Sequence, residues 1–296
     1  MKINLFLRAL RLSFVSVSIL PYIFGSLLYK DNFNLIKFIC GLIAAVTLHL
    51  SANLINDYYD SKSGCDWQDK KFYKFFGGSK LIQERILEET FYLKTSIVFL
   101  TISFISMMCI YFYIKSSFLI LIYILVIILS WQYSQGPLKL SYRYLGEITI
   151  FFIFGPILVM GGYFIQSKIF PHMKSFFLSL PFGLLTLSIL FVNELADYPD
   201  DIKVSKNTLV NLIKDKFAFI FYFFIMLSAL LFIVLSIFLG YLKIYALLSF
   251  VSIFLIYRAG KIIKNFYNDK NKLLLSSKIT IFLHNFISII LILSIR

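Results

Sequence analysis

Two short polar stretches of the sequence stand at the ends of apolar runs and share a pattern. Residues 53–60 read NLINDYYD and residues 193–200 read NELADYPD, with Asn, Asp, Tyr and Asp at the same four positions. If each apolar run continues as a helix into these octets, residues three or four apart share one face. The two faces then carry carboxylates and amides as follows: Asn53, Asn56, Asp57 and Asp60 on the first, and Asn193, Asp197 and Asp201 on the second.

The octets offer oxygen ligands and contain neither Cys nor His. Such hard donors favour Mg²⁺ or Mn²⁺ over zinc or copper, and Mg²⁺ usually completes its shell with water and substrate phosphates. Asp66, just beyond Gly64, can fold back to add a carboxylate. Two carboxylate clusters suit a diphosphate held by bridging metal ions from both sides. The three cysteines (Cys40, Cys65 and Cys109) have the spacing of neither a zinc site nor a disulfide framework.

The apolar runs indicate a polytopic membrane protein. Of the 296 residues, 59% are hydrophobic and 15% are charged, whereas a soluble domain carries about 25% charged residues. The runs approach the ~20 residues that span a bilayer and are continuous, which favours helices over barrel strands. We predict an all-α domain over 1–296 with nine transmembrane helices, near 12–30, 35–56, 93–114, 117–134, 145–165, 175–196, 217–238, 241–257 and 279–295. The first run lacks a small-residue cleavage site after it, so we expect a retained helix rather than a signal peptide.

The formal net charge of +14 follows the predicted topology. With the N-terminus in the cytoplasm, most Lys and Arg fall in inner segments, as the positive-inside rule requires. Topology and anionic headgroups therefore account for the charge better than a nucleic-acid partner does. The loops after both octets then face the cytoplasm, and we expect a bacterial inner-membrane location. Basic residues on that side that suit phosphate oxygens are Lys80, Arg85, Lys139, Arg143 and Lys206.

The distance between the octets indicates an internal repeat. Equivalent positions lie 140 residues apart, which corresponds to four of the predicted helices. We therefore expect helices one to four and five to eight to form a degenerate repeat, with the ninth helix appended. Membrane proteins built from repeats commonly place a binding site at the interface between them.

Longer stretches resemble the UbiA superfamily of intramembrane prenyltransferases. Residues 53–66, NLINDYYDSKSGCD, are similar to the first aspartate-rich motif of that superfamily, and residues 193–210, NELADYPDDIKVSKNTLV, to the second. GGSKLIQ at 77–83 and GPLKLSYRYLGEITIFFIFGPILVMGGYF at 136–164 resemble the menaquinone-making branch, the 1,4-dihydroxy-2-naphthoate polyprenyltransferases. The likeness extends over nearly the whole chain.

This resemblance implies transfer of a polyprenyl group from its diphosphate to an aromatic acceptor, most similar to 1,4-dihydroxy-2-naphthoate, with Mg²⁺ or Mn²⁺ as cofactor. It implies metal binding by Asp57, Asp60, Asp66, Asp197 and Asp201, with Asp57, Asp60, Asp197 and Asp201 catalytic. Contacts to the diphosphate are implied for Asn53, Asn56, Lys80, Lys139, Asn193 and Lys206, and Tyr142 is placed beside the acceptor. The prenyl tail would lie between helices that open towards lipid.

The chain departs from the superfamily pattern at two places. The commoner first motif has an aspartate at the position of Gly64, and the next acid here is Asp66, a spacing associated with the naphthoate branch. The first helix contains RALR where a basic residue followed by proline is frequent. We assign no site role to Arg8, Arg11, His49 and Glu147, and interpret His49 as a packing residue.

Two other functions fit the same motifs. A UbiA-type enzyme could use 4-hydroxybenzoate, haem or a lipid alcohol as its acceptor, because the ionisation chemistry would be the same. A cation-coupled transporter could also place acids at helix ends, although transporter sites usually lie near the middle of the bilayer.

Overall fold

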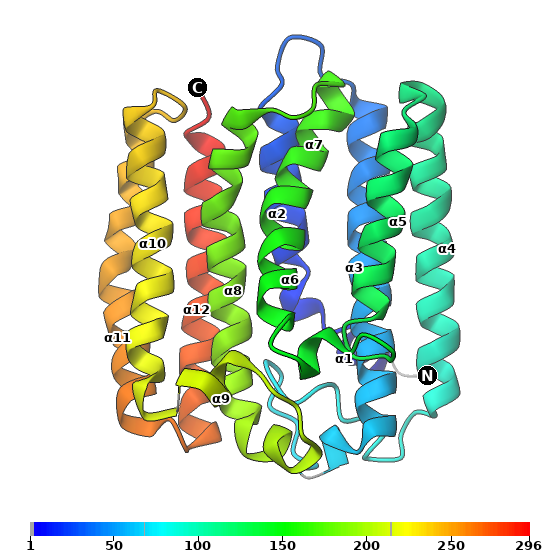
Figure 1. Cartoon of the computed structure of the whole chain (residues 1–296), viewed down its shortest axis with the longest axis vertical. Helices are drawn as coiled ribbons and strands as arrows, with labels where there is room; N and C mark the ends of the chain where they lie inside the picture. Colours follow the sequence, from blue (N-terminus) through cyan, green and yellow to red (C-terminus); the bar gives the residue numbers. More distant parts are fainter. Residues whose placement is uncertain (1–2, 68, 214) are drawn as a thin grey trace.

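The computed structural model describes residues 3–67, 69–213 and 215–296, which fold into a bundle of roughly parallel and antiparallel helices (Figure 1). Within these ranges the extended pairings are two isolated bridges, Arg143 with Asn207 and Leu242 with Ile295. The α-helices are α1 (Ile3–Ala9), α2 (Ser16–Leu27), α3 (Leu35–Ser63), α4 (Glu89–Ile114), α5 (Ser117–Trp131), α6 (Gly146–Phe152), α7 (Leu158–Ser167), α8 (Met173–Asp201), α9 (Leu209–Ile213), α10 (Ala218–Phe238), α11 (Ile253–Phe266) and α12 (Lys270–Leu293). The short 3₁₀ and π turns are η1 (Leu12–Phe14), η2 (Cys65–Trp67), η3 (Leu140–Tyr142), η4 (Ile153–Ile157), η5 (Ile202–Val204), η6 (Asp215–Phe217) and η7 (Ile244–Ser252). The predicted all-α fold is confirmed.

Seven of the described helical segments are long and apolar enough to cross a membrane. They are Leu35–Ser63, Glu89–Ile114, Gly146–Ser167, Met173–Val204, Ala218–Phe238, Ile244–Phe266 and Lys270–Leu293. An eighth arises if Ile3–Ala9 and Leu12–Leu27, bent by 53°, count as one span. The remaining predicted span is α5, whose 15 residues fall short of a bilayer crossing. The chain is therefore an integral membrane protein, and the predicted count of nine is not confirmed.

The outer faces of the bundle are apolar. Phe112, Phe238, Phe254 and Leu293 are each at least 70% exposed. Many other large apolar side chains are also exposed, and an extensive apolar surface of this kind fits contact with lipid.

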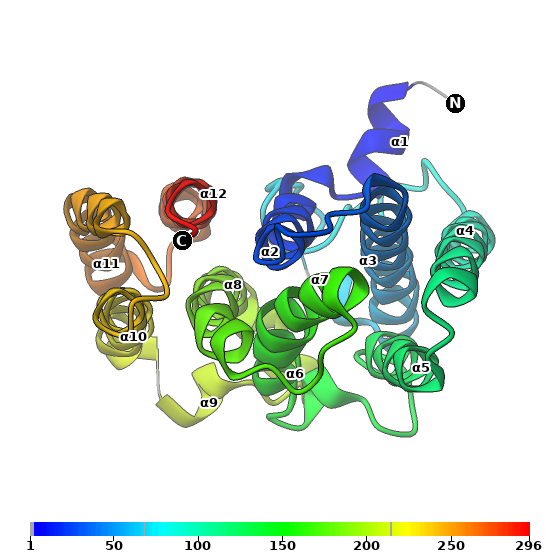
Figure 2. The same cartoon turned by 90° about the horizontal axis from the view of Figure 1, so that it is seen from above.

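The central helices are α2, α3, α8 and the α6–η4–α7 segment. Seen along the helix axes, α4 covers α3 on one side, while α10, α11 and α12 lie on the other side beside α8 (Figure 2). A small residue allows α2 and α7 to approach closely, because a Cβ on Gly25 would collide with the Val159 carbonyl. Close approach at small residues is a common way in which membrane helices pack.

α3 and α8 bring both acidic octets to the same end of the bundle. Each has 29 residues and is about 44 Å long at 1.5 Å per residue, against a hydrocarbon core of ~30 Å. Asn34 caps α3 by accepting from Lys37 N at 3.0 Å, and His172 Nδ1 caps α8 by accepting from Ser175 N at 3.3 Å. Because both helices start at one end and exceed the core, their last turns project beyond it at the other end.

Candidate active site

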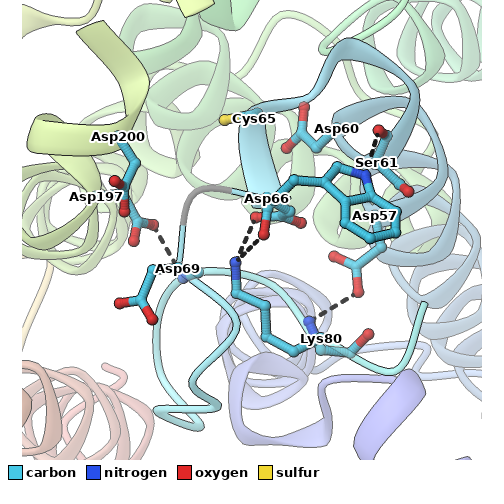
Figure 3. A network of polar contacts seen from close by, with 12 residues as sticks. Asp57, Asp60, Ser61, Cys65, Asp66, Asp69, Lys80, Asp197 and Asp200 are labelled. Carbon is cyan, nitrogen blue, oxygen red and sulfur yellow. Dashed lines mark hydrogen bonds and ion pairs between the residues drawn. The ribbon is translucent and has the colours of Figure 1, made fainter. Parts of the chain in front are cut away.

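A loop of four residues, Gly77 to Lys80, connects the two acidic helix ends (Figure 3). Gly77 N donates to Asp197 Oδ2 at 3.0 Å, on the α8 side. Ser79 N donates to Asp57 Oδ2 at 3.0 Å, on the α3 side. The loop therefore fixes the distance between the two motifs through its own backbone.

Lys80, the last residue of this loop, neutralises the carboxylate that follows α3. Its Nζ lies 3.1 Å from Asp66 Oδ1 and donates to Asp66 O at 2.9 Å. Burial raises the pKa of Asp66 to about 7, against the nearby Lys80, which lowers it, while Asp60 and Asp57 raise it further. The electrostatic cost of crowding these acids is high, and cations would relieve it.

Gly78 stands where the loop touches the first motif most closely. Its φ is +71°, and a Cβ there would lie 2.6 Å from Asp66 Oδ2 and 3.3 Å from Asp57 Oδ1. A left-handed backbone favours glycine, and a carboxylate this close leaves no room for a Cβ. The second glycine of the sequence GGSK is therefore part of the site.

The first motif is held by residues from two other segments. Arg11 Nη1 lies 3.2 Å from Asp57 Oδ1, and Arg11 itself has φ +52° at the break between α1 and α2. Tyr142 OH donates to Asp60 Oδ1 at 3.3 Å and is 2.8 Å from Ser63 Oγ. The break in the first span thus places the Arg11 guanidinium at the site. The sequence analysis missed this role of Arg11, because the sequence RALR gives no sign of a helix break.

The second motif combines paired and unpaired carboxylate oxygens. Asp201 Oδ1 lies 3.5 Å from Lys206 Nζ and accepts from Cys65 Sγ at 3.1 Å, whereas the buried Oδ2 has no hydrogen-bond partner among the described residues. Burial lowers the pKa of Lys206, but Asp201, Cys65 and Asp60 outweigh it, so the net pKa lies above the usual value. Lys206 therefore remains charged.

A third lysine, from the start of α12, joins the site from the far side. Lys270 Nζ lies 2.6 Å from Asp200 Oδ2 and 3.0 Å from Asp69 Oδ2. Asp69 and Asp200 lie beside Asp197 in Figure 3 and line the same cavity as it does. Nothing in the sequence pairs these residues, because Lys270 follows Asp69 by about 200 positions and belongs to no motif.

These side chains line a polar cavity of about 100 Å³ at the end of the bundle. It is lined by Arg11, Asn56, Asp60, Cys65, Asp66, Asp69, Tyr73, Phe76, Gly77, Gly78, Lys80, Tyr133, Leu190, Asn193, Asp197, Asp200, Asp201, Lys206 and Lys270. Eight predicted site residues are in this set. Asp57 and Tyr142 are not among these lining residues: Asp57 accepts from Ser79 N of the loop, and Tyr142 donates to Asp60.

Two predicted diphosphate ligands lie elsewhere. Asn53 lines the neighbouring apolar cavity and donates through Nδ2 to Leu10 O at 3.4 Å. Lys139 is exposed, outside the cavity lining, with Nζ 5.5 Å from the centre of the Tyr142 ring. The structure thus brings most of the predicted residues together and leaves these two at a distance.

An apolar cavity of about 210 Å³ continues from the polar one between α2, α3, α5, α6 and α8. The two share Arg11, Asn56, Tyr133, Leu190 and Asn193 as lining residues. A third cavity of about 90 Å³, lined by residues that include Tyr22, Met107 and Gly161, shares Ala45, Leu48, Val126 and Leu158 with the second. A charged group and a long apolar chain could therefore be held end to end.

The donor set fits a divalent cation completed by a ligand from outside. Within the described ranges, no group of three His, Cys, Asp or Glu side chains converges closely enough to hold an ion alone. The unpartnered Asp201 Oδ2 and the oxygen-rich lining are nevertheless what Mg²⁺ uses when phosphate and water fill the rest of its shell. Asp60, Asp66, Asp197 and Asp201 are the candidates that line the cavity.

Fold and cavity together define an integral membrane helical bundle with an acidic, cation-rich site at one end. The profile of the UbiA prenyltransferase family matches residues 18–286, and the chain belongs to this family. It is 29% identical over 225 residues to the human UbiA prenyltransferase domain-containing protein 1, covering 73% of this chain and 63% of that protein. It is 25% identical over 206 residues to 1,4-dihydroxy-2-naphthoate octaprenyltransferase of Bacillus subtilis, covering 68% of this chain and 63% of that one.

The match thus spans less than two thirds of the length of these curated relatives. Among solved structures, a UbiA homolog from Archaeoglobus fulgidus, bound to GPP and Mg²⁺, superposes with a TM-score of 0.64 at 15% identity. That alignment covers 97% of this chain and 99% of the other, so the two share their fold.

Proposed function

We propose that this protein transfers a polyprenyl group from a polyprenyl diphosphate to an aromatic acceptor. The observation that carries the proposal is the junction of the two cavities: a polar one lined by Asp, Lys and Arg side chains opens into an apolar one through shared residues. A polyprenyl diphosphate has the same two parts in the same order. Family membership supports this reaction class.

The charged residues have distinct tasks in this reaction. Lys80 and Lys206 line the polar cavity and would bind phosphate oxygens, and Arg11 stands where the two cavities meet. Asp60, Asp66, Asp197 and Asp201 would hold Mg²⁺, which neutralises charge on the diphosphate as the allylic C–O bond breaks. The GPP and Mg²⁺ in the Archaeoglobus structure support this choice of cation.

The allylic carbon then meets the acceptor in the apolar cavity. There an electron-rich ring carbon attacks it, and the new C–C bond replaces the broken C–O bond. Phe14 and Phe154 line this cavity, and aromatic ring faces stabilise a carbocation.

For the acceptor we propose 1,4-dihydroxy-2-naphthoate, which places the protein in menaquinone biosynthesis. The Bacillus subtilis relative carries that activity in its name. The GGSK loop, whose contacts link both motifs, and the segment 136–164 are the sequence features that favour this branch. With this acceptor, loss of its carboxylate as CO₂ would accompany alkylation. We propose a bacterial inner membrane as its location, with the site facing the cytoplasm.

The test is product formation by purified protein in lipid vesicles with labelled polyprenyl diphosphate, 1,4-dihydroxy-2-naphthoate and Mg²⁺. We expect a prenylated, decarboxylated naphthoate that disappears with EDTA and in Asp57→Ala and Asp197→Ala. Asp31→Ala is the matched control, because Asp31 is an exposed acid in the α2–α3 connection. Turnover of 4-hydroxybenzoate alone would replace the acceptor, and no product with any acceptor from a folded preparation would refute the reaction.

A further inference from the structure

A histidine lines the apolar cavity and is hydrogen-bonded through one of its two ring nitrogens. His49 on α3 lines it, is 9% exposed, and packs edge-on against Phe154 with the ring centres 5.1 Å apart. Its Nδ1 is 3.0 Å from Ser18 Oγ on α2. The histidine that we had interpreted as packing therefore has one nitrogen engaged with the protein.

The neighbouring serine determines which nitrogen of His49 carries the proton. Ser18 Oγ donates its single proton to Val15 O at 2.9 Å. It can then only accept from His49, so Nδ1 carries the proton, and in the neutral ring Nε2 has a lone pair. Nε2 has no hydrogen-bond partner among the described residues. The cavity thus presents a hydrogen-bond acceptor to whatever occupies it.

The position of His49 relates this acceptor atom to the reacting groups. It precedes Asn53 by four residues and Asp57 by eight, on the same face of α3. At 1.5 Å per residue, His49 is about 12 Å deeper along the helix than Asp57. His49 therefore lines the apolar cavity below the acidic turn of α3, on the side away from the polar cavity. A neutral imidazole nitrogen binds a hydroxyl there and disfavours a carboxylate.

We propose that His49 Nε2 accepts a hydrogen bond from a ring hydroxyl of the aromatic acceptor, with Ser18 as the positioning residue that fixes the tautomer. The bond orients the ring and leaves more electron density on the carbon that attacks. This inference rests on the proposed prenyl transfer and adds the group that recognises the acceptor.

Three variants separate this role from packing. His49→Phe keeps a ring of similar size but removes the acceptor atom, and His49→Gln retains an acceptor oxygen near the position of Nε2. Ser18→Ala removes the hydroxyl that keeps the proton on His49 Nδ1. Its matched control is Ser188→Ala on α8, because Ser188 is also buried and donates to the carbonyl three residues earlier, at 2.7 Å.

The readout is kcat/KM for 1,4-dihydroxy-2-naphthoate and for its two mono-O-methyl ethers, together with acceptor binding by titration calorimetry. In wild type, one ether should be poorer than the dihydroxy compound by about tenfold, as expected for one lost hydrogen bond. His49→Phe should lose about tenfold on the dihydroxy compound and nothing further on that ether. His49→Gln should recover part of the loss, and KM for the polyprenyl diphosphate should not change.

Equal losses on all three acceptors would show that His49 only packs, and no loss at all would show that it does not touch the acceptor. Either result overturns the inference while wild-type turnover upholds the reaction. If wild type turns over no aromatic acceptor, the proposed function fails. Unchanged binding of the naphthoate to His49→Phe would then overturn the inference as well.

Discussion

Replacing Gly78 by alanine tests whether the GGSK loop sets the geometry of the acidic site. The substitution imposes a left-handed backbone on an L-residue, since φ is +71°, at a cost of about 1–2 kcal/mol. It also places a methyl group 2.6 Å from Asp66 Oδ2, so the carboxylate must move by roughly half an ångström or more to restore van der Waals contact. Since displacements of about 1 Å can lower rates by about 100-fold, we expect kcat/KM to fall by about 10- to 100-fold.

Gly64→Ala is the matched control for this change. Gly64 has φ +85° at the end of α3, and a Cβ there meets nothing within 4 Å. It therefore suffers the same backbone strain without touching a carboxylate. The assay is prenyl transfer over a range of Mg²⁺ concentrations, with thermal unfolding measured in parallel. Both variants should unfold at similar temperatures, and only Gly78→Ala should need more Mg²⁺. Equal loss of activity in the two variants, or full activity in Gly78→Ala, would refute the geometric argument.

Three other substitutions test further parts of the site. Tyr142→Phe removes the donor to Asp60, and we expect turnover to fall by about 3- to 10-fold with unchanged folding, as measured by steady-state kinetics. Lys270→Ala leaves Asp200 without its closest cation, so we expect a lower unfolding temperature that added Mg²⁺ partly restores; an unchanged melting curve would contradict this. Gly161→Leu adds a side chain where a Cβ meets nothing within 4 Å at the third cavity. Competition between short and long polyprenyl diphosphates should then favour the short one, and an unchanged ratio would place the tail elsewhere.

Sequence reasoning succeeded where a property is local and repeated. Continuous hydropathy predicted the helical membrane bundle. The period of the octets predicted that the acids of the two helices lie close together, and the structure brings Asp60, Asp197 and Asp201 to one cavity, with Asp57 bound to the adjoining loop; their roles in binding and catalysis stay a prediction. It fell short for α5, because the predicted span 117–134 included Gln132, Tyr133 and Ser134, which lie beyond the end of the helix at Trp131.

The sequence pattern could not predict the positions of residues that are placed by irregular backbone or by partners far away in the sequence. Arg11 reaches the site because the chain turns left-handed between α1 and α2, and no residue type there demands that turn. Lys270 reaches the acidic site only because α12 packs beside α8. Lys139 was predicted from its charge, its predicted side of the membrane and the family resemblance, and its exposure could not be read from the loop sequence.

The lengths of α3 and α8 tie the active end of this protein to the thickness of the membrane around it. Both helices begin at a capped end and finish in carboxylates, so the apolar length between cap and acid is fixed. A thicker bilayer would draw the acidic turns towards the hydrocarbon, where charge is costly, and a thinner one would expose apolar turns to water. Hydrophobic mismatch therefore acts directly on the acidic end of the bundle, and lipid chain length becomes a variable that affects the site without any contact between lipid and site.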